Sequence, residues 1–461
     1  MLTWTLFGLY VTATALLAWR GGQRSSGADG FAIGSGRMHP VMAGLTLGAC
    51  LASSAMFVIM PGFVYAEGLP ALIGFSLPLA AGLGVGLWGL APRFQAQGSG
   101  ILTVPHWLGA RYESPALRRL FAGLNALQLA YLVLVTVGCA YVMEQALGVP
   151  YPGAATFIVV FVFGYTAFGG TWAHAFTNSA QGVVMLIMAL VVLGTGWQHW
   201  VSGAVVETLL SSGWTAPDSP LFSSVWEVWL VPFGIGVALT TQPHLMTKAL
   251  YVDGRRDLGV TIAVGMGCFL VFSLVLFAGA YARLDLAAGL PQDQVMAQWL
   301  QVALPWPWLA AMVSVAVLAA SMSTLDGLLV AVSASVGNDL FRGSVGANRW
   351  VLVGLAAVTL AAALSPPELV LILGQLGVYG LVAASVPPLV AGLFLDGPLS
   401  ARRAALSALL ALVVHFGLAL GGWTPNPGVA ALCGLAVALP VALWRPAPAP
   451  ALGRVLAPGA N

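Results

Sequence analysis

Apolar segments long enough to cross a membrane recur along the whole chain, and this recurrence limits the possible folds. A membrane-spanning helix needs about 20 predominantly apolar residues. We count about thirteen such segments, near residues 2–19, 40–66, 69–92, 116–146, 150–168, 173–197, 222–247, 257–282, 303–336, 348–365, 367–395, 401–421 and 426–445. Only 7% of the residues are charged, whereas soluble domains have about 25%. The sequence therefore predicts an all-α polytopic membrane protein embedded in a lipid bilayer.

The basic residues test this count and predict the orientation, because Lys and Arg accumulate in cytoplasmic loops. With the N-terminus outside, every basic residue except Arg283 falls in a predicted inside loop. We therefore expect the N-terminus outside and the C-terminus inside. The net charge of +2 reflects this bias and gives no reason to invoke nucleic acid as a partner.

The apolar segment near 303–336 contains a polar stretch, Ala320-Ser321-Met322-Ser323-Thr324-Leu325-Asp326-Gly327. Polar groups inside a membrane are costly and usually functional. One face of a helix here would carry Ala320, Ser323, Thr324 and Gly327, with Asp326 on its flank. Uncharged oxygen ligands suit a hard cation such as sodium. We therefore expect this helix to form one wall of a cation site.

Two other segments contain residues that interrupt helices. The segment 40–66 has small and hydroxyl residues from Gly48 to Ser54, followed by Pro61-Gly62, and the segment 222–247 has Thr240-Thr241-Gln242-Pro243-His244. In secondary transporters a pair of interrupted helices supplies carbonyl groups to a site near the membrane midplane. Close packing through small residues is the alternative for the first segment.

Sequence motifs for enzymatic chemistry are absent. The chain has no P-loop, dinucleotide fingerprint, metalloprotease motif or nucleophile elbow. Cys50, Cys139, Cys268 and Cys433 lie far apart in the sequence without metal-binding spacing, so we expect four free cysteines. We do not expect an enzyme.

The polar stretch also carries a family resemblance. Leu318-Ala319-Ala320-Ser321-Met322-Ser323-Thr324-Leu325-Asp326, followed by Leu328-Leu329, Ser333-x-Ser335 and Asp339-Leu340-Phe341, resembles the signature of the sodium/solute symporter family. That family includes bacterial proline, pantothenate, galactose and sialic acid transporters. Three further stretches match it: Pro61-Gly62-x-x-Tyr65-x-x-Gly68, Gly169-Gly170 with Thr177-x-x-x-Gln181, and Gln242-Pro243-His244. The resemblance covers about residues 2–445.

The resemblance implies a leucine-transporter-like fold with two inverted five-helix repeats, at residues 40–197 and 222–395. Residues 1–39 would add an extra span and an inside loop, 198–221 an outside loop, and 396–461 two peripheral spans and a short inside tail. It further implies alternating access driven by inward sodium movement. We expect a multi-pass protein of the bacterial inner (plasma) membrane, as a monomer or weak oligomer.

The resemblance also implies site residues. The family's shared sodium site would use the backbone carbonyls of Ala49, Ala52 and Ala320 and the hydroxyls of Ser323 and Thr324. The residues matching the family's substrate pocket are Ser53, Ser54, Met56, Phe75, Tyr131, Gln242 and Gln375.

Three positions depart from relatives that have a further sodium site. Those relatives carry Asp at the position of Asn178, and a pair of serines at the positions of Asp326 and Gly327. An amide cannot supply negative charge, so we expect the further site to be absent and one sodium ion to move per solute. Asp326 could be a proton site, a helper of the cation site or a structural residue.

The candidate pocket residues also bear on the solute. Ile235 and Leu239 stand where proline transporters have aromatic residues, and Leu51 stands where they have an acidic one. The fourth span lacks the Arg of sialic acid transporters. We expect no Lys or Arg to line the core, so helix-end amides and hydroxyls would hold a substrate carboxylate. A small monocarboxylate, amino acid or vitamin-like acid fits best.

Three functions are compatible with these features. The first is a sodium-coupled symporter of a small-molecule solute. The second is a proton-coupled transporter of the same fold, in which Asp326 titrates. The third is a membrane sensor without turnover, although the short Pro/Ala-rich tail leaves no room for a signalling domain.

Overall fold

The computed structural model describes residues 1–25, 27–52, 55–304, 306–341, 344–365 and 370–444. Every regular element in these ranges is a helix. The first half contains α1 (Leu2–Gly22), α2 (Gly27–Ile33), η1 (Gly34–Gly36), α3 (Pro40–Leu51), η2 (Ala55–Ile59), α4 (Met60–Glu67), α5 (Leu69–Phe75), α6 (Leu77–Ala96), α7 (Val104–Arg111), α8 (Pro115–Leu124), η3 (Asn125–Gln128), α9 (Leu129–Leu147) and α10 (Tyr151–Thr195). The second half contains α11 (Trp197–Val201), α12 (Ala204–Ser211), α13 (Val225–Leu239), α14 (Pro243–Met246), η4 (Thr247–Leu250), α15 (Arg255–Phe272), η5 (Ser273–Leu276), α16 (Phe277–Asp285), α17 (Val295–Ala303), α18 (Pro307–Leu340), α19 (Val345–Ala363), α20 (Val370–Phe394), α21 (Ala401–Leu420) and α22 (Pro427–Leu443).

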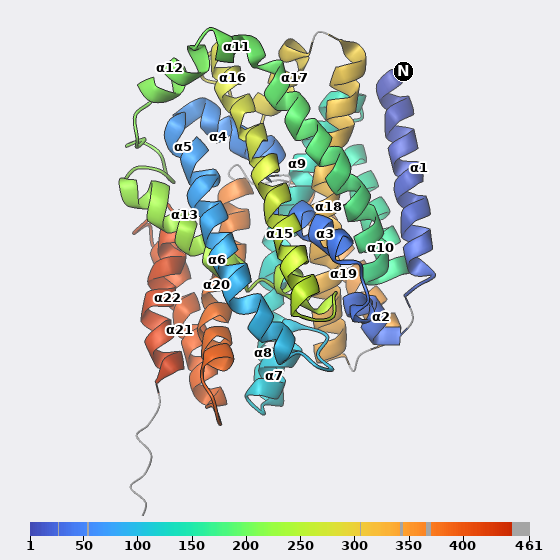
Figure 1. Cartoon of the computed structure of the whole chain (residues 1–461), viewed down its shortest axis with the longest axis vertical. Helices are drawn as coiled ribbons and strands as arrows, with labels where there is room; N and C mark the ends of the chain where they lie inside the picture. The colour runs from blue at the N-terminus through green and yellow to red at the C-terminus, as the bar shows by residue number, and fades with distance from the viewer. Residues whose placement is uncertain (26, 53–54, 305, 342–343, 366–369, 445–461) are drawn as a thin grey trace, which may run out of the picture.

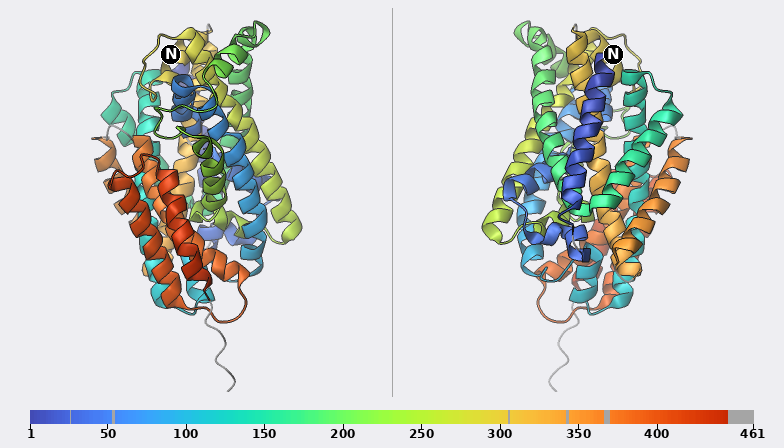
Figure 2. Two further views of the ribbon diagram at one scale, coloured as in Figure 1. Left: turned by 90° about the vertical axis from the view of Figure 1, so that its left-hand side faces the viewer. Right: turned by 90° about the vertical axis from the view of Figure 1, so that its right-hand side faces the viewer.

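The long helices run roughly along one direction, and α18 lies inside the bundle (Figure 1). The central apolar stretch of α18 is 100% buried, whereas the corresponding stretches of α1 and α19 are 17% buried. α18 packs against α10, α9, α19, α1 and α3. The helices α1 and α21–α22 lie on opposite sides of the bundle (Figures 1 and 2). The polar stretch of the sequence is therefore enclosed by other helices and does not face lipid.

The helices agree with a polytopic membrane protein. Within the described residues, nine helical runs are long and apolar enough to cross a membrane, and a tenth is added if α3 and the run after it form one broken span. Two shorter apolar helices, α13 and α22, lie where the sequence predicts further spans. Apart from residues 150, 196 and 197, the predicted spans 150–168 and 173–197 correspond to α10, which is broken at Gly170 (φ 53°, ψ −141°). Thirteen spans and the orientation stay predictions.

The first predicted interruption follows α3. Ala52 has φ −90° and ψ 76°, outside the helical region. The chain continues as a turn of π-helix, η2, and as α4, whose first turn holds Pro61. Proline is tolerated there because first-turn amides have no helical partner. The run after the break is bent by 52° from α3, and these described residues confirm the interruption; Ser53 and Ser54 lie outside them.

The second predicted interruption separates α13 from α14. Ser224 caps the start of α13 by accepting a hydrogen bond from the amide of Glu227. The helix ends at Leu239, and Gln242 has an extended backbone (φ −58°, ψ 135°) before Pro243 opens α14. Proline disfavours helical backbone in the residue before it. The interruption at Thr240–Gln242 is therefore confirmed.

Glycines allow α13 to pack closely against α6. This close packing positions two helices that line the pocket described below. A Cβ atom on Gly236 would lie 2.5 Å from the carbonyl oxygen of Leu79, and one on Gly82 would lie 2.0 Å from that of Phe233. Small residues of this kind let helix backbones approach closely in membranes. Larger side chains at either position would push α13 away from α6.

Candidate functional site

The end of α3 faces the polar stretch of α18. The hydroxyl oxygen of Ser323 lies 3.4 Å from the carbonyl oxygen of Ala49 and 2.7 Å from that of Ala320. The hydroxyl oxygen of Thr324 lies 3.5 Å from the same Ala320 oxygen. Ala52 is fully buried at the end of α3. The fold thus brings together four of the five predicted sodium ligands, and the fifth is three residues from Ala49.

The oxygens at this point suit a hard cation better than a transition metal. Because α3 stops at Leu51, its last carbonyl groups lie beyond the regular helical hydrogen-bond pattern. Together with the two hydroxyls they form an uncharged oxygen set, which sodium-like ions accept. No group of three or more His, Cys, Asp or Glu side chains that could hold a metal occurs among the residues described.

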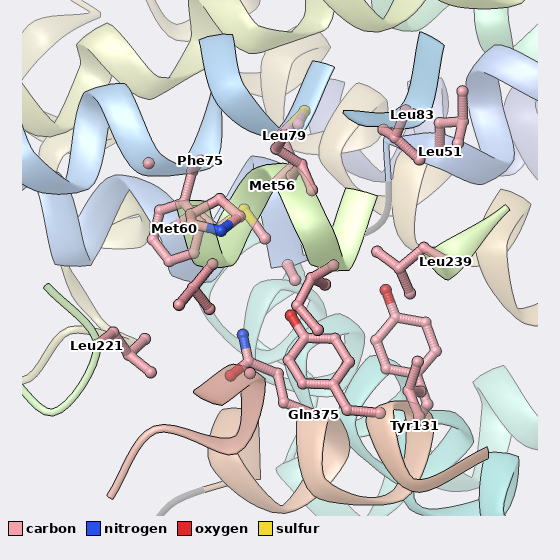
Figure 3. A pocket seen from close by; sticks show the side chains of 18 of the residues that line it. Leu51, Met56, Met60, Phe75, Leu79, Leu83, Tyr131, Leu221, Leu239 and Gln375 are labelled. Atoms are coloured by element: carbon pink, nitrogen blue, oxygen red, sulfur yellow. The ribbon is translucent and has the colours of Figure 1, made fainter. Parts of the chain in front are cut away.

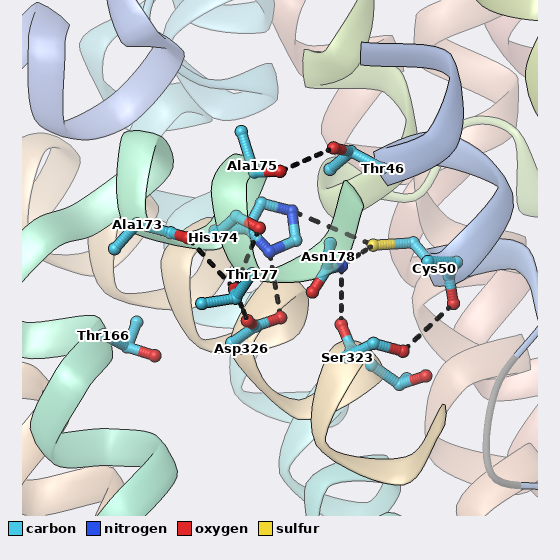
Figure 4. Close-up of polar contacts among 12 residues, drawn as sticks. Thr46, Cys50, Thr166, Ala173, His174, Ala175, Thr177, Asn178, Ser323 and Asp326 are labelled. Carbon is cyan, nitrogen blue, oxygen red and sulfur yellow. Dashed lines mark hydrogen bonds and ion pairs between the residues drawn. The ribbon is translucent and has the colours of Figure 1, made fainter. Parts of the chain in front are cut away.

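Asp326 is buried next to this site, and both of its carboxylate oxygens accept hydrogen bonds (Figure 4). One oxygen accepts from the hydroxyls of Tyr165 at 2.9 Å and Thr177 at 3.0 Å. The other lies 2.9 Å from Nδ1 of His174. All three partners lie on α10, so the carboxylate ties α10 to α18.

Lys248 completes this cluster, and its position corrects the expectation that no Lys or Arg lines the core. Its ammonium nitrogen lies 3.1 Å from Nε2 of His174, and the residue is only 2% exposed. The sequence places it next to the loop before α15, where a basic residue would normally reach water. Pro243 instead starts a new helical turn, which carries Lys248 on η4 back into the bundle.

Asn178 connects the cluster to the candidate sodium site. Its amide nitrogen donates a hydrogen bond to the backbone carbonyl of Ser323 at 2.9 Å and lies 3.6 Å from the sulfur of Cys50. Cys50 Sγ is in turn 3.9 Å from Nε2 of His174. Asn178 and Asp326, the two positions singled out in the sequence, therefore belong to one buried network (Figure 4).

Cys50 also lines a pocket between the helices, which is shown in Figure 3. Four of the predicted substrate residues line it: Met56, Phe75, Tyr131 and Gln375. Gln242 is not among the lining residues. Its amide nitrogen donates a hydrogen bond to the backbone carbonyl of Val378, which does line the pocket, at 3.0 Å. Ser53 and Ser54 lie outside the described residues. The lining is mostly apolar, including Ile235 and Leu239.

Sequence reasoning missed His174 and Lys248, and it gave Tyr165 and Cys50 no role in the site. A signal for His174 exists, because His174, Thr177, Asn178 and Gln181 follow the i, i+3, i+4, i+7 spacing of one helical face. Gln181 extends this polar stripe, since its amide nitrogen donates to the Tyr10 hydroxyl at 2.7 Å. A polar stripe inside an apolar segment indicates a buried network, even where no single residue in it is diagnostic.

Known proteins resemble this chain along nearly its whole length. The sodium/pantothenate symporter of Escherichia coli (strain K12) is 31% identical over 423 residues, which are 85% of this chain and 84% of that protein. A sodium/proline symporter of Staphylococcus aureus is 26% identical over 454 residues, 89% of this chain and 85% of that protein. A solved structure of a Na⁺-coupled sialic acid symporter has the same fold, with a TM-score of 0.79 at 17% identity, covering 97% of this chain and 98% of its own.

The family assignment does not depend on these individual proteins. The sequence model of the sodium:solute symporter family matches residues 31–411 of this chain. This range includes the interrupted end of α3, the polar stripe of α10 and the polar stretch of α18. The four matching motifs noted in the sequence lie within the same range. The chain therefore belongs to the sodium:solute symporter family.

Proposed function

We propose that this chain is a sodium-coupled symporter that imports a small organic solute by alternating access, with one sodium ion per solute. The observation that carries the proposal is the contact of Ser323 on α18 with Ala49 at the interrupted end of α3, with the Thr324 hydroxyl next to it on the same helix. A sodium ion bound there would hold α3 and α18 together, because its oxygen ligands come from both helices. A ligand that favours one conformation shifts the population towards it. Sodium binding and solute binding then strengthen each other.

The arrangement of the two breaks supports alternating access. The breaks after α3 and after α13 stand five predicted spans apart, as expected for inverted repeats at residues 40–197 and 222–395. We assign the leucine-transporter-like fold and about thirteen spans on this basis, and an outside N-terminus on the distribution of the basic residues. The relatives are bacterial, which supports a multi-pass protein of the bacterial plasma membrane.

The pocket supports a solute that is partly apolar and has few polar groups. Met56, Phe75, Ile235 and Leu239 supply apolar contacts, and Gln375 supplies a polar group whose amide oxygen has no partner among the described residues. A small monocarboxylate, an amino acid or a vitamin-like acid has this combination. Since the Escherichia coli relative is named for pantothenate, pantothenate is the first solute to test.

The environment of Asp326 supports a single sodium ion per solute. Both of its oxygens are already occupied by hydrogen-bond donors from α10. A second cation at Asp326 would have to displace these donors and would meet the positive charge of Lys248 behind His174. Asn178 is neutral and offers no compensating charge.

Transport measurements in proteoliposomes test the proposal. A library of small acids, with pantothenate first, is screened for ligands that raise the melting temperature in sodium but not in potassium. Uptake of the radiolabelled hit should then follow an imposed sodium gradient. Uptake driven by a pH gradient without sodium would instead support the proton-coupled alternative based on Asp326.

A further inference from the structure

The sequence contains a single lysine, Lys248, and the fold buries it at the junction of three segments. It lies on η4, directly after the second interrupted helix. Its ammonium group contacts His174 on α10 at 3.1 Å and lies 5.3 Å from the centre of the Tyr251 ring. Burying an ammonium group costs free energy unless it is paired and hydrogen-bonded. Packing alone therefore does not explain why Lys248 is buried here.

The proton positions in this cluster follow from the donors and acceptors. An ammonium group only donates hydrogen bonds, so Nε2 of His174 must accept from Lys248. Nδ1 of the same ring then carries a proton and donates it to Asp326 at 2.9 Å. The imidazole is therefore neutral, and it joins the positive charge of Lys248 to the negative charge of Asp326.

This chain of contacts joins elements that alternating access must move apart. Lys248 belongs to the segment that follows the break after α13, whereas His174 and Asp326 belong to α10 and α18. The break at Thr240–Gln242 means that no continuous helix connects η4 to α13. If the segment from α14 to η4 moves away from α10, the contact between Lys248 and His174 must break.

The cluster also lies at one end of the solute pocket. Cys50, His244 and Leu245 line the pocket, and Cys50 contacts His174. The opposite end is lined by Glu227 in the first turn of α13, by Leu221 before that helix, and by Asn426, which caps α22 and donates hydrogen bonds to both. α13 therefore runs from the predicted outer end of the pocket towards the end lined by Cys50, His244 and Leu245, which we call the pocket floor. Lys248 lies beyond that floor. The positive-inside rule assigns this end to the cytoplasmic side.

We propose that Lys248, acting through His174 and Asp326, is a latch that closes the cytoplasmic end of the solute pocket. The latch rests on the proposed sodium coupling. Asn178 hydrogen-bonds the backbone of Ser323 and touches Cys50, the neighbour of Ala49, so the candidate sodium site and the latch share both α3 and α18. Sodium bound between these helices keeps the latch closed, and loss of sodium releases η4 and exposes the lysine.

The lone lysine provides its own assay. A membrane-impermeant amine-acylating reagent can modify only Lys248 and the N-terminal amine, and peptide mass spectrometry separates the two products. The full-length protein is labelled in lipid nanodiscs with sodium or with potassium at equal ionic strength. Acylation of Lys248 should be at least about fivefold faster in potassium, within the usual range of coupling between sites. The N-terminal amine, normalised in the same sample, should react equally in both.

Two variants separate the latch from a general structural effect. His174→Ala removes the acceptor for Lys248, so acylation should be fast in sodium as well as in potassium. The matched control is His199→Ala, which removes the other His–Asp pair of the described chain, His199 with Asp285 at 3.0 Å, far from the pocket floor on α11. In this control variant, Lys248 should still be acylated more slowly in sodium than in potassium. Vesicles of known orientation should show that the reagent reaches Lys248 from the cytoplasmic face only.

The outcomes distinguish the latch from the transport function. Sodium-driven uptake together with sodium-independent acylation of Lys248 would overturn the latch and leave the symporter proposal intact. Acylation from the outer face alone would also overturn it. If neither uptake nor acylation responds to sodium, both proposals fail. The wild-type comparison stands even if His174→Ala does not fold.

Discussion

The side-chain amide of Asn178 donates a hydrogen bond to the backbone carbonyl of Ser323 over 2.9 Å, and this contact links two polar regions that the sequence keeps apart. Asn178 lies on α10 beside the Asp326 cluster, while Ser323 carries a hydroxyl of the candidate sodium site. A carbonyl that accepts this bond is fixed in direction. The orientation of Ser323, and with it the sodium site, therefore depends on α10.

Asn178→Ala should reduce stability. It leaves the buried carbonyl of Ser323 without this donor, and an unsatisfied buried group costs about 1–3 kcal/mol. The melting temperature should fall. Asn348→Ala is the matched control, because Asn348 is equally buried and its amide atoms have no partner among the described residues. Equal losses in the two variants would show that the Ser323 contact contributes nothing specific.

Ser323→Ala should weaken sodium activation of transport. The change removes one of the proposed oxygen ligands, and a loss of about 1.4 kcal/mol corresponds to a tenfold weaker affinity. The sodium concentration for half-maximal uptake should rise about tenfold or more. Ser333→Ala on the same helix is the control, because the Ser333 hydroxyl is buried but bonds only its own helix, at the carbonyl of Val330. An unchanged sodium dependence in Ser323→Ala would contradict the assigned site.

The backbone breaks could be predicted from the sequence because their causes are local. Pro243 restricts the backbone of the residue before it, and Gly48, Ser53 and Ser54 near Ala52 are poor helix formers. The shared face of Ala320, Ser323 and Thr324 follows from helical periodicity alone. These features need no knowledge of the neighbouring helices, and the structure confirms both breaks and the burial of that face.

The Lys248 cluster could not be predicted in the same way. Lys248 and His174 are 74 residues apart, and Lys248 and Asp326 are on different elements, so only the tertiary fold brings them together. Charge patterning assigned Lys248 to an inside loop, because most basic residues near span ends reach water. The exception arises because the turn at Pro243 directs η4 inwards. The helical spacing of polar residues along 174–181 was the available sequence signal for this cluster. It did not identify Lys248 as the partner of His174.

Asp326→Asn should impair folding and transport together. An amide cannot accept from Tyr165, Thr177 and His174 at once, and Lys248 loses the charge that balances it. Removing one partner of a buried ion pair costs about 3–5 kcal/mol. We expect a lower melting temperature and little uptake. Asp285→Asn is the control, since Asp285 is exposed: its carboxylate pairs with His199 and accepts a hydrogen bond from Trp299, and an exposed ion pair contributes about 0–1 kcal/mol.

Parallel measurement of labelled sodium and solute fluxes should give one sodium ion per solute. The expectation follows from the neutral amide of Asn178 and from the occupied oxygens of Asp326. The sodium dependence of the initial uptake rate should accordingly be hyperbolic. A flux ratio of two would show that a second cation enters despite Lys248, and the single-ion mechanism would have to be abandoned.

Gln375→Leu should raise the KM for solute while leaving the sodium dependence unchanged. Gln375 lines the pocket, and its amide oxygen has no partner among the described residues, so its side chain is available to a solute. Losing one hydrogen bond from an uncharged group costs about 0.5–1.5 kcal/mol, which is a two- to tenfold rise in KM. Gln298→Leu, on α17 outside the pocket lining, should leave the KM unchanged. If Gln375→Leu changed only the sodium dependence and not the KM for solute, Gln375 would act on the ion. The pocket would then not be the solute site.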